Sequence, residues 1–183
     1  MKNKIEKMLL STGRKGIEDL LRWMDENGFY NAPCSSRFHL AKPGGLAEHS
    51  WNVLRIATNI SESLSDQNNY WQTHELYRSI IICSLLHDLG KAGQFCKPNY
   101  AVNEDLPFPA YKSNKDLLYI PHEVRSVAIA SKFIELTEDE QFAILYHNGL
   151  YGELQSVKGN ETPLYMILHF ADMWASRVIE KEE

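Results

Sequence analysis

The stretch SLLHDLGKAG, residues 84–93, contains the residues of this 183-residue chain that are best suited to bind a metal ion or an anion. His87 and Asp88 stand side by side at the end of an apolar run, and Lys91 follows three residues after Asp88. An ionised carboxylate in apolar surroundings is unfavourable unless it pairs with a cation or binds a metal ion. The arrangement therefore indicates a metal site, with a lysine near enough to contact an anionic ligand.

Further imidazole and carboxylate groups occur on other predicted helices, most of them near a helix end. They are His49, His122, His147 and Asp172. A single histidine on a helix is more often a hydrogen-bonded core or surface residue than a ligand, so the prediction depends on the whole set. Helix starts and ends alternate in height in an antiparallel bundle, so such residues can converge at one mouth. A converged set of this kind suits one or two divalent ions, such as Mn, Fe, Zn, Co, Ni or Mg.

Helices must position these residues, because apolar side chains recur mainly at helical spacing along the chain. Ile17 to Met24 form one amphipathic segment, which Gly28 is suited to end. Further helices are predicted over residues 46–64, from Thr73 to Leu86, from Pro121 to Leu136, from Thr137 and from Thr162 to Ile179. Thr137 and Glu140 are spaced as a capping box. The run from Ile80 to Leu86 is apolar nearly all round, which indicates a central helix buried on most sides.

Residues 92–119 interrupt the helical pattern. This segment contains three prolines and no helical period, so we expect a long loop or a short hairpin. The predicted fold class is an all-α bundle with one irregular insertion at about residues 92–119. We expect a single domain over residues 1–183, with an N-terminal helical extension at about 1–30 and a core at about 32–180.

The composition favours a small substrate in a reducing compartment. The net charge is -5, which offers no basic patch for long duplex nucleic acid. Three cysteines, an odd number with no close pair, do not indicate a disulfide framework. We find no long apolar run and no signal sequence at the N-terminus, so we expect a cytoplasmic protein without membrane contact. The sequence leaves a homodimer open.

Three stretches resemble the signatures of the HD superfamily of metal-dependent phosphohydrolases. They are GGLAEHSWNVLRIA, LLHDLGKAG and LHFADMW, in that order. The resemblance extends from Ala32 to the last predicted helix and implies an HD-domain helical bundle. Within the superfamily, GGLAEH, YHNGLYG and HFADMWASR are most similar to the HD domain of bacterial 3′→5′ exoribonucleases. Those enzymes often have two consecutive histidines where this chain has His147 and Asn148.

The resemblance also implies roles for individual residues. The ligands of a first metal ion would be His49, His87, Asp88 and Asp172, and those of a second would be His122 and His147, with Asp88 as the bridge. Lys91 matches a lysine that lies near the substrate phosphate, and with Asp88 it forms the expected catalytic pair. We expect Gly90 to let the chain leave the preceding helix so that Lys91 can reach a metal-bound phosphate. Three further residues are candidates for binding the substrate: Arg55, Arg37 and His39.

Together these residues predict a divalent-metal-dependent phosphohydrolase, either a phosphomonoesterase or a phosphodiesterase. We expect it to hydrolyse a phosphoester of a nucleotide or short oligonucleotide with a metal-activated water. Two alternatives stay open. The same ligand set supports a mixed-valent di-iron oxygenase in some relatives, and a chain that keeps the metal without turnover would be a regulatory module that binds metal or nucleotide.

Overall fold

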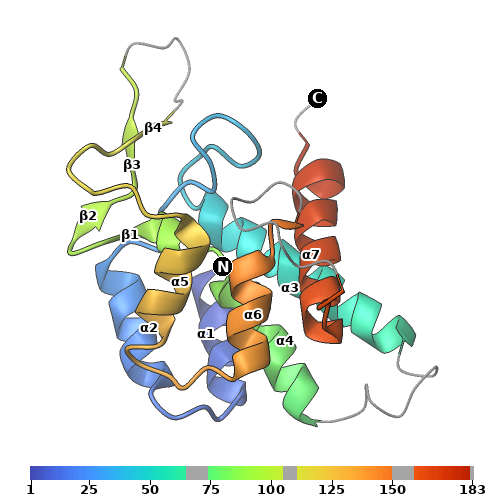
Figure 1. The fold of residues 1–183 in the computed structure, drawn as a ribbon. Helices are drawn as coiled ribbons and strands as arrows, with labels where there is room; N and C mark the ends of the chain where they lie inside the picture. Colours follow the sequence, from blue (N-terminus) through green and yellow to red (C-terminus); the bar gives the residue numbers. More distant parts are fainter. Residues whose placement is uncertain (65–73, 105–110, 150–158, 182–183) are drawn as a thin grey trace.

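The computed structural model describes residues 1–64, 74–104, 111–149 and 159–181, and these form an all-α bundle (Figure 1). This confirms the predicted fold class. In chain order the α-helices of the described residues are α1 (Lys2–Ser11), α2 (Ile17–Glu26), α3 (Gly45–Leu64), α4 (His74–Leu86), α5 (His122–Ala130), α6 (Glu138–Tyr146) and α7 (Pro163–Trp174). None of the described helices has the length and apolar character needed to cross a membrane.

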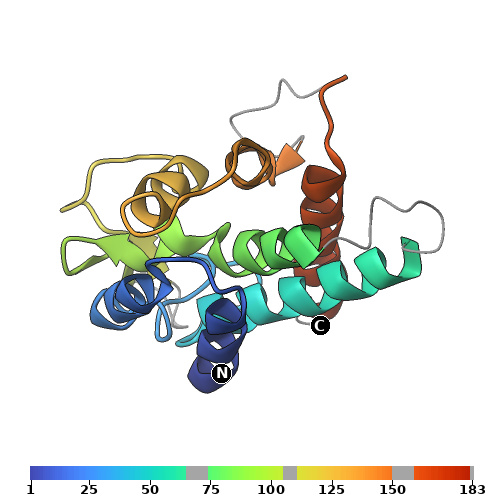
Figure 2. The same ribbon diagram turned by 90° about the horizontal axis from the view of Figure 1, so that it is seen from below.

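Helix α4 is the central element, as its apolar character predicts. Every residue from Ser79 to Leu86 is buried. The helix contacts α3, α6, α7 and α1, and Figure 2 shows it between α3 on one side and α5 and α6 on the other. A helix surrounded on most sides gives the residues at its C-terminal end a fixed position.

The N-terminal extension consists of two helices that pack onto the same core. Ile5 and Leu9 of α1, and Leu20 and Met24 of α2, are fully buried members of the main apolar cluster. Gly28 follows α2 with a φ of 77°, the left-handed conformation expected at that position.

Two helix starts agree with the sequence in detail. Thr137 and Glu140 form the predicted capping box at the start of α6. Thr162 caps α7, with Pro163 in its first turn.

Helix α5 ends at Ala130, six residues before the predicted end at Leu136. The chain turns there so that Ile134 and Leu136 can be buried.

The insertion predicted at residues 92–119 contains two short hairpins. A 3₁₀ turn (Leu89–Ala92) leads into strands β1 (Gly93–Gln94) and β2 (Lys97–Pro98), which pair antiparallel. Strands β3 (Tyr100–Val102) and β4 (Tyr111–Ser113) form the second pair. Both hairpins lie at one end of the bundle, beyond the start of α5 (Figure 1).

The last helix was predicted as continuous, but it changes its winding after Trp174. Residues Ala175–Ile179 form a π-helical turn, closed by a hydrogen bond of 2.9 Å from the Glu180 N–H to the carbonyl oxygen of Ala175. Such wide turns inside helices occur frequently at functional sites. Here the turn lies against α3, the helix that carries His49.

Candidate metal centre

The predicted metal ligands come together around the carboxylate of Asp88. His49 is in α3, His87 and Asp88 directly follow α4, His122 begins α5, His147 follows α6, and Asp172 is in α7. Asp88 is 1% exposed, and its two oxygens face different groups of histidines. We therefore describe the centre as two halves that share Asp88: the His49 half (His49, His87 and Asp172) and the His122 half (His122 and His147).

In the His49 half, the ligand atoms approach the Oδ2 side of Asp88. The Nε2 atoms of His49 and His87 lie 3.6 and 3.5 Å from Oδ2 of Asp88. The two Nε2 atoms are 3.3 Å apart, and Oδ1 of Asp172 is 3.1 Å from Nε2 of His49. The potential ligand atoms of His49, His87 and Asp172 all lie within 4.8 Å of one another. Bond lengths of about 2.0–2.2 Å to a single Zn²⁺-like ion require this degree of proximity.

In the His122 half, the ligand atoms approach Oδ1 of Asp88. Nε2 of His122 is 3.1 Å from this oxygen, and Nε2 of His147 is 3.6 Å from it. The amide nitrogen of Asn148 lies 3.3 Å from Nε2 of His122 and can donate to its lone pair. Asn148 therefore contacts the centre. It stands at the position where the exoribonucleases often have a second histidine.

The outer nitrogen of every one of these imidazoles has an acceptor within 3.1 Å. Nδ1 of His87 and of His147 lies 2.9 and 2.7 Å from the carbonyl oxygens of Ser84 and Ile144. Nδ1 of His49 is 2.8 Å from a carboxylate oxygen of Glu180. Nδ1 of His122 is 3.1 Å from a carboxylate oxygen of Glu123.

These contacts assign the tautomers. A carbonyl or carboxylate oxygen can only accept, so Nδ1 of His49, His87 and His147 carries a proton and Nε2 faces inward. Burial alone would lower the pKa of His49, but its hydrogen bonds to Asp172 and Glu180 help to raise this pKa well above its ordinary value, so Nε2 of His49 also carries a proton when no metal ion is bound. The inner face of the centre then consists of imidazole Nε2 atoms and carboxylate oxygens that lie close to one another. Oδ1 of Asp88 is buried and has no hydrogen-bond donor among the described residues. Nitrogen and oxygen atoms packed this closely need protons or a metal ion between them, and a divalent metal ion fits this set of ligands.

Lys91 lies against the same carboxylate. Its Nζ is 2.7 Å from Oδ2 of Asp88. Burial alone would lower the pKa of Lys91, but the Asp88 carboxylate outweighs this effect and raises it, so Lys91 remains an ammonium ion. Burial alone would raise the pKa of Asp88, but Lys91 and the surrounding imidazoles hold it well below its ordinary value. In Asp172, the hydrogen bond from His49 likewise outweighs burial and lowers the pKa.

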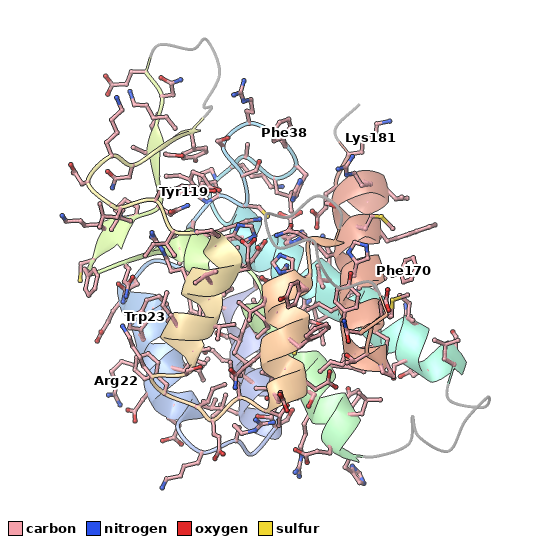
Figure 3. The ribbon with its side chains drawn as sticks, viewed as in Figure 1. Arg22, Trp23, Phe38, Tyr119, Phe170 and Lys181 are labelled. Atoms are coloured by element: carbon pink, nitrogen blue, oxygen red, sulfur yellow. The ribbon has the colours of Figure 1, made fainter. Side chains whose placement is uncertain are left out.

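A cavity of about 530 Å³ opens beside Asp172 and Lys91. The predicted residues Arg37 and His39 line it, together with two cations from the end of the chain, Arg177 and Lys181. The lining thus contains four cations in a protein whose net charge is -5. They are Arg37, Lys91, Arg177 and Lys181, and the carboxylates of the lining are Asp172 and Glu180. Phe38 also lines the cavity, and Figure 3 shows Phe38 and Lys181 on separate segments at one end of the molecule. The remaining candidate, Arg55, is exposed and does not line this cavity.

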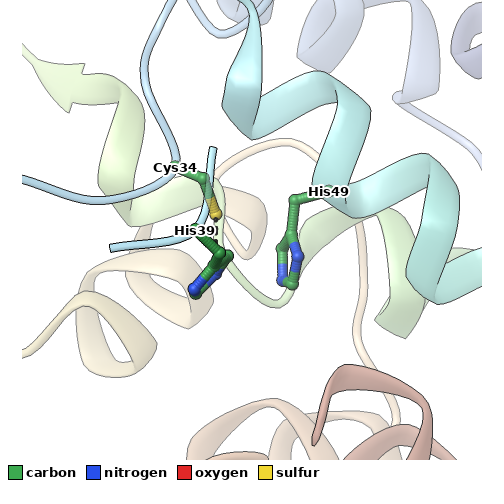
Figure 4. A group of neighbouring side chains, drawn as sticks. All are labelled: Cys34, His39 and His49. Atoms are coloured by element: carbon green, nitrogen blue, oxygen red, sulfur yellow. Dashed lines mark hydrogen bonds between the residues drawn. The ribbon is translucent and has the colours of Figure 1, made fainter. Parts of the chain in front are cut away.

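Cys34 also reaches the centre, although the sequence suggested no role for it. Its Sγ is 3.4 Å from Nε2 of His39 and 4.0 Å from Oδ2 of Asp88. Figure 4 shows Cys34 and His39 beside the His49 ring, with ligand atoms within 4.8 Å of one another. Burial raises the pKa of the Cys34 thiol to about 11, so the thiol is protonated at neutral pH. Burial, followed by the charges of His49 and Lys91, lowers the pKa of His39 to about 4, so His39 is neutral there.

Glu123 and Glu180 were also missed. Glu123 directly follows a predicted ligand, which is a usable signal in retrospect. Glu180 lies eight residues beyond Asp172, and α-helical spacing alone gives no reason to place it beside His49. Only the π-helical turn, which the sequence did not predict, makes this placement understandable.

Comparisons with known proteins are consistent with this geometry. The family model described as HD domain matches residues 46–173, which is more than half of the chain. No curated protein and no solved structure matches the chain. The match includes all the predicted metal ligands, whereas Cys34, His39 and Glu180 lie outside it. Proteins with this domain are generally metal-dependent hydrolases. The matched range and the buried cluster of histidines and aspartates together show that this chain belongs to the HD-domain family.

Proposed function

We propose that the protein is a divalent-metal-dependent phosphohydrolase that acts on a phosphoester of a nucleotide or short oligonucleotide. One observation supports this most strongly: the cluster of ligands around Asp88 adjoins a cavity lined by four cations. A divalent ion at these ligands would lower the pKa of a water molecule and stabilise charge on phosphoryl oxygens. Its ligands would be His49, His87, Asp88 and Asp172, with His122 and His147 available for a second ion.

Lys91 stabilises the charge that develops on the phosphoryl group. Its ammonium is held beside Asp88 and is 14% exposed at the floor of the cavity. A preorganised positive charge in a site with little water is worth more than the same charge in bulk solvent. Lys91 therefore contributes most in the transition state, where charge on the transferred group is greatest.

The rim of the cavity binds the rest of the substrate. Arg37, Arg177 and Lys181 supply positive charge at some remove from the ligands, which suits a second phosphate or a phosphodiester. Phe38 is 72% exposed beside them and offers a face on which a base can stack. A cavity of about 530 Å³ suits a small phosphorylated molecule or the end of a short strand rather than a long duplex.

The similarity to the exoribonuclease HD domain supports a narrower proposal, that short RNA is among the substrates. Asn148, beside His122, and Arg177, after Asp172, both face the cavity. We expect activity in the cytoplasm, with Mn²⁺ as the first ion to test. A phosphodiesterase would cleave a phosphate that is esterified on both sides, whereas a phosphomonoesterase would release inorganic phosphate from a terminal one.

Metal analysis of the purified protein, followed by a hydrolysis screen, tests the proposal. The screen should contain nucleoside mono-, di- and triphosphates, cyclic dinucleotides and short RNA, with Mn²⁺ added and with chelator as the blank. We expect Mn²⁺-dependent release of phosphate or nucleotide. The Lys91→Met variant should keep its metal and lose about 100-fold in kcat, since removing one preorganised donor typically costs 100- to 1,000-fold.

Lys42→Met is the matched control, because Lys42 is a half-exposed lysine that pairs with Glu48 and does not line the cavity. Its kcat should equal that of the unaltered protein. No hydrolysis by the metal-loaded protein, or full activity of the Lys91 variant, would contradict the proposed function. Bound iron with a mixed-valent EPR signal and no phosphatase activity would instead support the di-iron oxygenase, and metal binding without any turnover would support a regulatory module.

A further inference from the structure

We infer that Glu180 and Glu123 are positioning residues, one for each half of the metal centre. In each half, one histidine is backed by a main-chain carbonyl group and the other by a buried carboxylate. Glu180 backs His49, and Glu123 backs His122. The inference rests on the metal centre of the proposed function and is independent of which substrate is hydrolysed.

The environment of Glu180 indicates that its carboxylate serves His49. Glu180 is 6% exposed, and its Oε2 lies 2.8 Å from Nδ1 of His49. Its Oε1 accepts a hydrogen bond of 2.9 Å from the side chain of Asn52, one turn further along α3. Both oxygens are therefore held, and the carboxylate cannot rotate away from the imidazole. Among the described residues its remaining ion-pair contact is His39, 3.9 Å away, so no lysine or arginine there accounts for its burial.

Burying a carboxylate is costly unless the charge is compensated. A neutral imidazole alone compensates it only in part, because its N–H carries no full positive charge. A proton or a metal ion on the opposite nitrogen of the same ring completes the compensation, since the ring then carries positive charge toward Glu180. A carboxylate in this position fixes the tautomer and the ring orientation and makes Nε2 a stronger ligand.

The π-helical turn is the local device that brings Glu180 to His49. Each residue of an α-helix advances the side-chain direction by about 100°, so one additional residue in a turn redirects everything that follows it. The turn occupies Ala175–Ile179, directly between Asp172, which faces the inner nitrogen of His49, and Glu180, which faces its outer nitrogen. One helix therefore approaches both sides of the same ring.

Glu123 plays the corresponding part in the His122 half, with a simpler geometry. It is 3% exposed, and its Oε2 lies 3.1 Å from Nδ1 of the preceding residue, His122. Both residues are in the first turn of α5, so the carboxylate is delivered without a special turn. The shared arrangement in two unrelated local structures favours a function in ligation over an accident of packing.

Metal titrations of the full chain test the inference, with each glutamate variant as the matched control for the other. We would titrate metal-free protein with Zn²⁺ against a chromophoric chelator, for Glu180→Ala, Glu180→Gln, Glu123→Ala and Glu123→Gln. Loss of such an outer partner typically weakens metal binding by about 10- to 100-fold. Each alanine variant should show this loss for one equivalent of Zn²⁺ and leave the other within twofold. The glutamine variants, which keep the shape and the acceptor, should lose less.

Combining each glutamate substitution with His122→Ala shows which half of the centre each glutamate serves. With the His122 half disabled, Glu180→Ala should still weaken the remaining equivalent, and Glu123→Ala should have no further effect. Long-range ¹H–¹⁵N spectra of the Zn²⁺-loaded protein report the His49 tautomer directly: a downfield Nδ1–H signal should be lost in Glu180→Ala and kept in Glu123→Ala. A merely structural role would not move this signal. If the alanine variants do not fold, the glutamine variants carry the same test.

Equal weakening of both equivalents by each variant, or affinities within twofold of the unaltered protein, would overturn the inference. Its failure and that of the proposed function are distinguishable. Unaltered protein that shows the expected Zn²⁺ pattern but hydrolyses no phosphoester would refute the function and leave the inference standing. Hydrolysis by unaltered protein, with unchanged Zn²⁺ affinity in all glutamate variants, would do the reverse.

Discussion

The two halves of the metal centre are built into the fold to different depths. In the His49 half, the side chains of His49 and His87 are 1% and 0% exposed. They are carried by α3 and α4, helices of 20 and 13 residues that pack on each other and on α7. In the His122 half, the side chain of His147 is 1% exposed but that of His122 is 27% exposed, and helices α5 and α6 have 9 residues each. The histidines of the His49 half are thus carried by long, buried helices, and those of the His122 half by short, peripheral helices.

This difference leads us to expect unequal metal affinities. Ligands held by a close-packed core need little rearrangement to bind an ion, whereas short peripheral helices lose more freedom when they do. His122 also lines a second cavity of about 300 Å³, formed largely by the insertion around Tyr100 and Tyr119, which gives solvent a separate approach to this half. The His49 half should therefore fill first and the His122 half should exchange its ion more easily.

The largest effect is expected where the halves meet. Asp88→Asn removes the charge that both halves share and should abolish tight metal binding by each of them. Hydrolysis should fall by roughly a thousandfold or more, equivalent to at least ~4 kcal/mol of transition-state stabilisation. Elemental analysis after dialysis and a hydrolysis assay measure the two losses. Asp19→Asn, at an exposed position on α2, is the control and should change neither.

Alteration of one ligand in each half should separate them. His49→Ala should weaken the affinity of the tighter equivalent by about 100-fold or more, whereas His122→Ala should leave one tight equivalent in place. Isothermal titration of metal-free protein with Mn²⁺ gives both stoichiometry and affinity. A single tight equivalent that survives His49→Ala and disappears in His122→Ala would show that depth of burial does not determine the order of filling.

The sequence predicted which histidines and aspartates come together better than it predicted their surroundings. Local signals, such as the apolar run before His87 and the capping box of α6, fix an element without knowledge of the rest of the fold, and the resemblance to the HD signatures implied the set of ligands. Cys34 and Glu180 could not be read in this way, because each depends on how distant segments meet. Glu180 in addition requires a π-helical turn, and the residues at Ala175–Ile179 give no periodic signal for it.

Gly90 illustrates the same limit. The sequence suggests that this glycine lets the chain leave α4, but the structure gives a different reason, close approach to α5. A Cβ atom at Gly90 would lie 2.3 Å from the carbonyl oxygen of His122 and 2.9 Å from Cβ of Arg125. The Gly90 N–H also donates to Oγ of Ser126, 2.8 Å away. The contact thus joins the turn after Asp88 directly to the helix that carries His122.

Gly90→Ala provides the finest test of the comparison between the halves. The added methyl group must push α5 outward, because its nearest neighbours are backbone and Cβ atoms that cannot rotate away. Overpacking of this kind costs about 1–3 kcal/mol, measurable by thermal unfolding of the metal-free protein. Metal titration should show the metal affinity of the His122 half weakened by roughly tenfold, in proportion to a displacement that costs ~1.4 kcal/mol, with the affinity of the His49 half within twofold.

Ser126→Ala is the control, because it removes the hydrogen bond without the clash and should have the smaller effect. Equal weakening of both halves by Gly90→Ala would mean that α5 is held as firmly as α3, and that the two supports do not differ in rigidity.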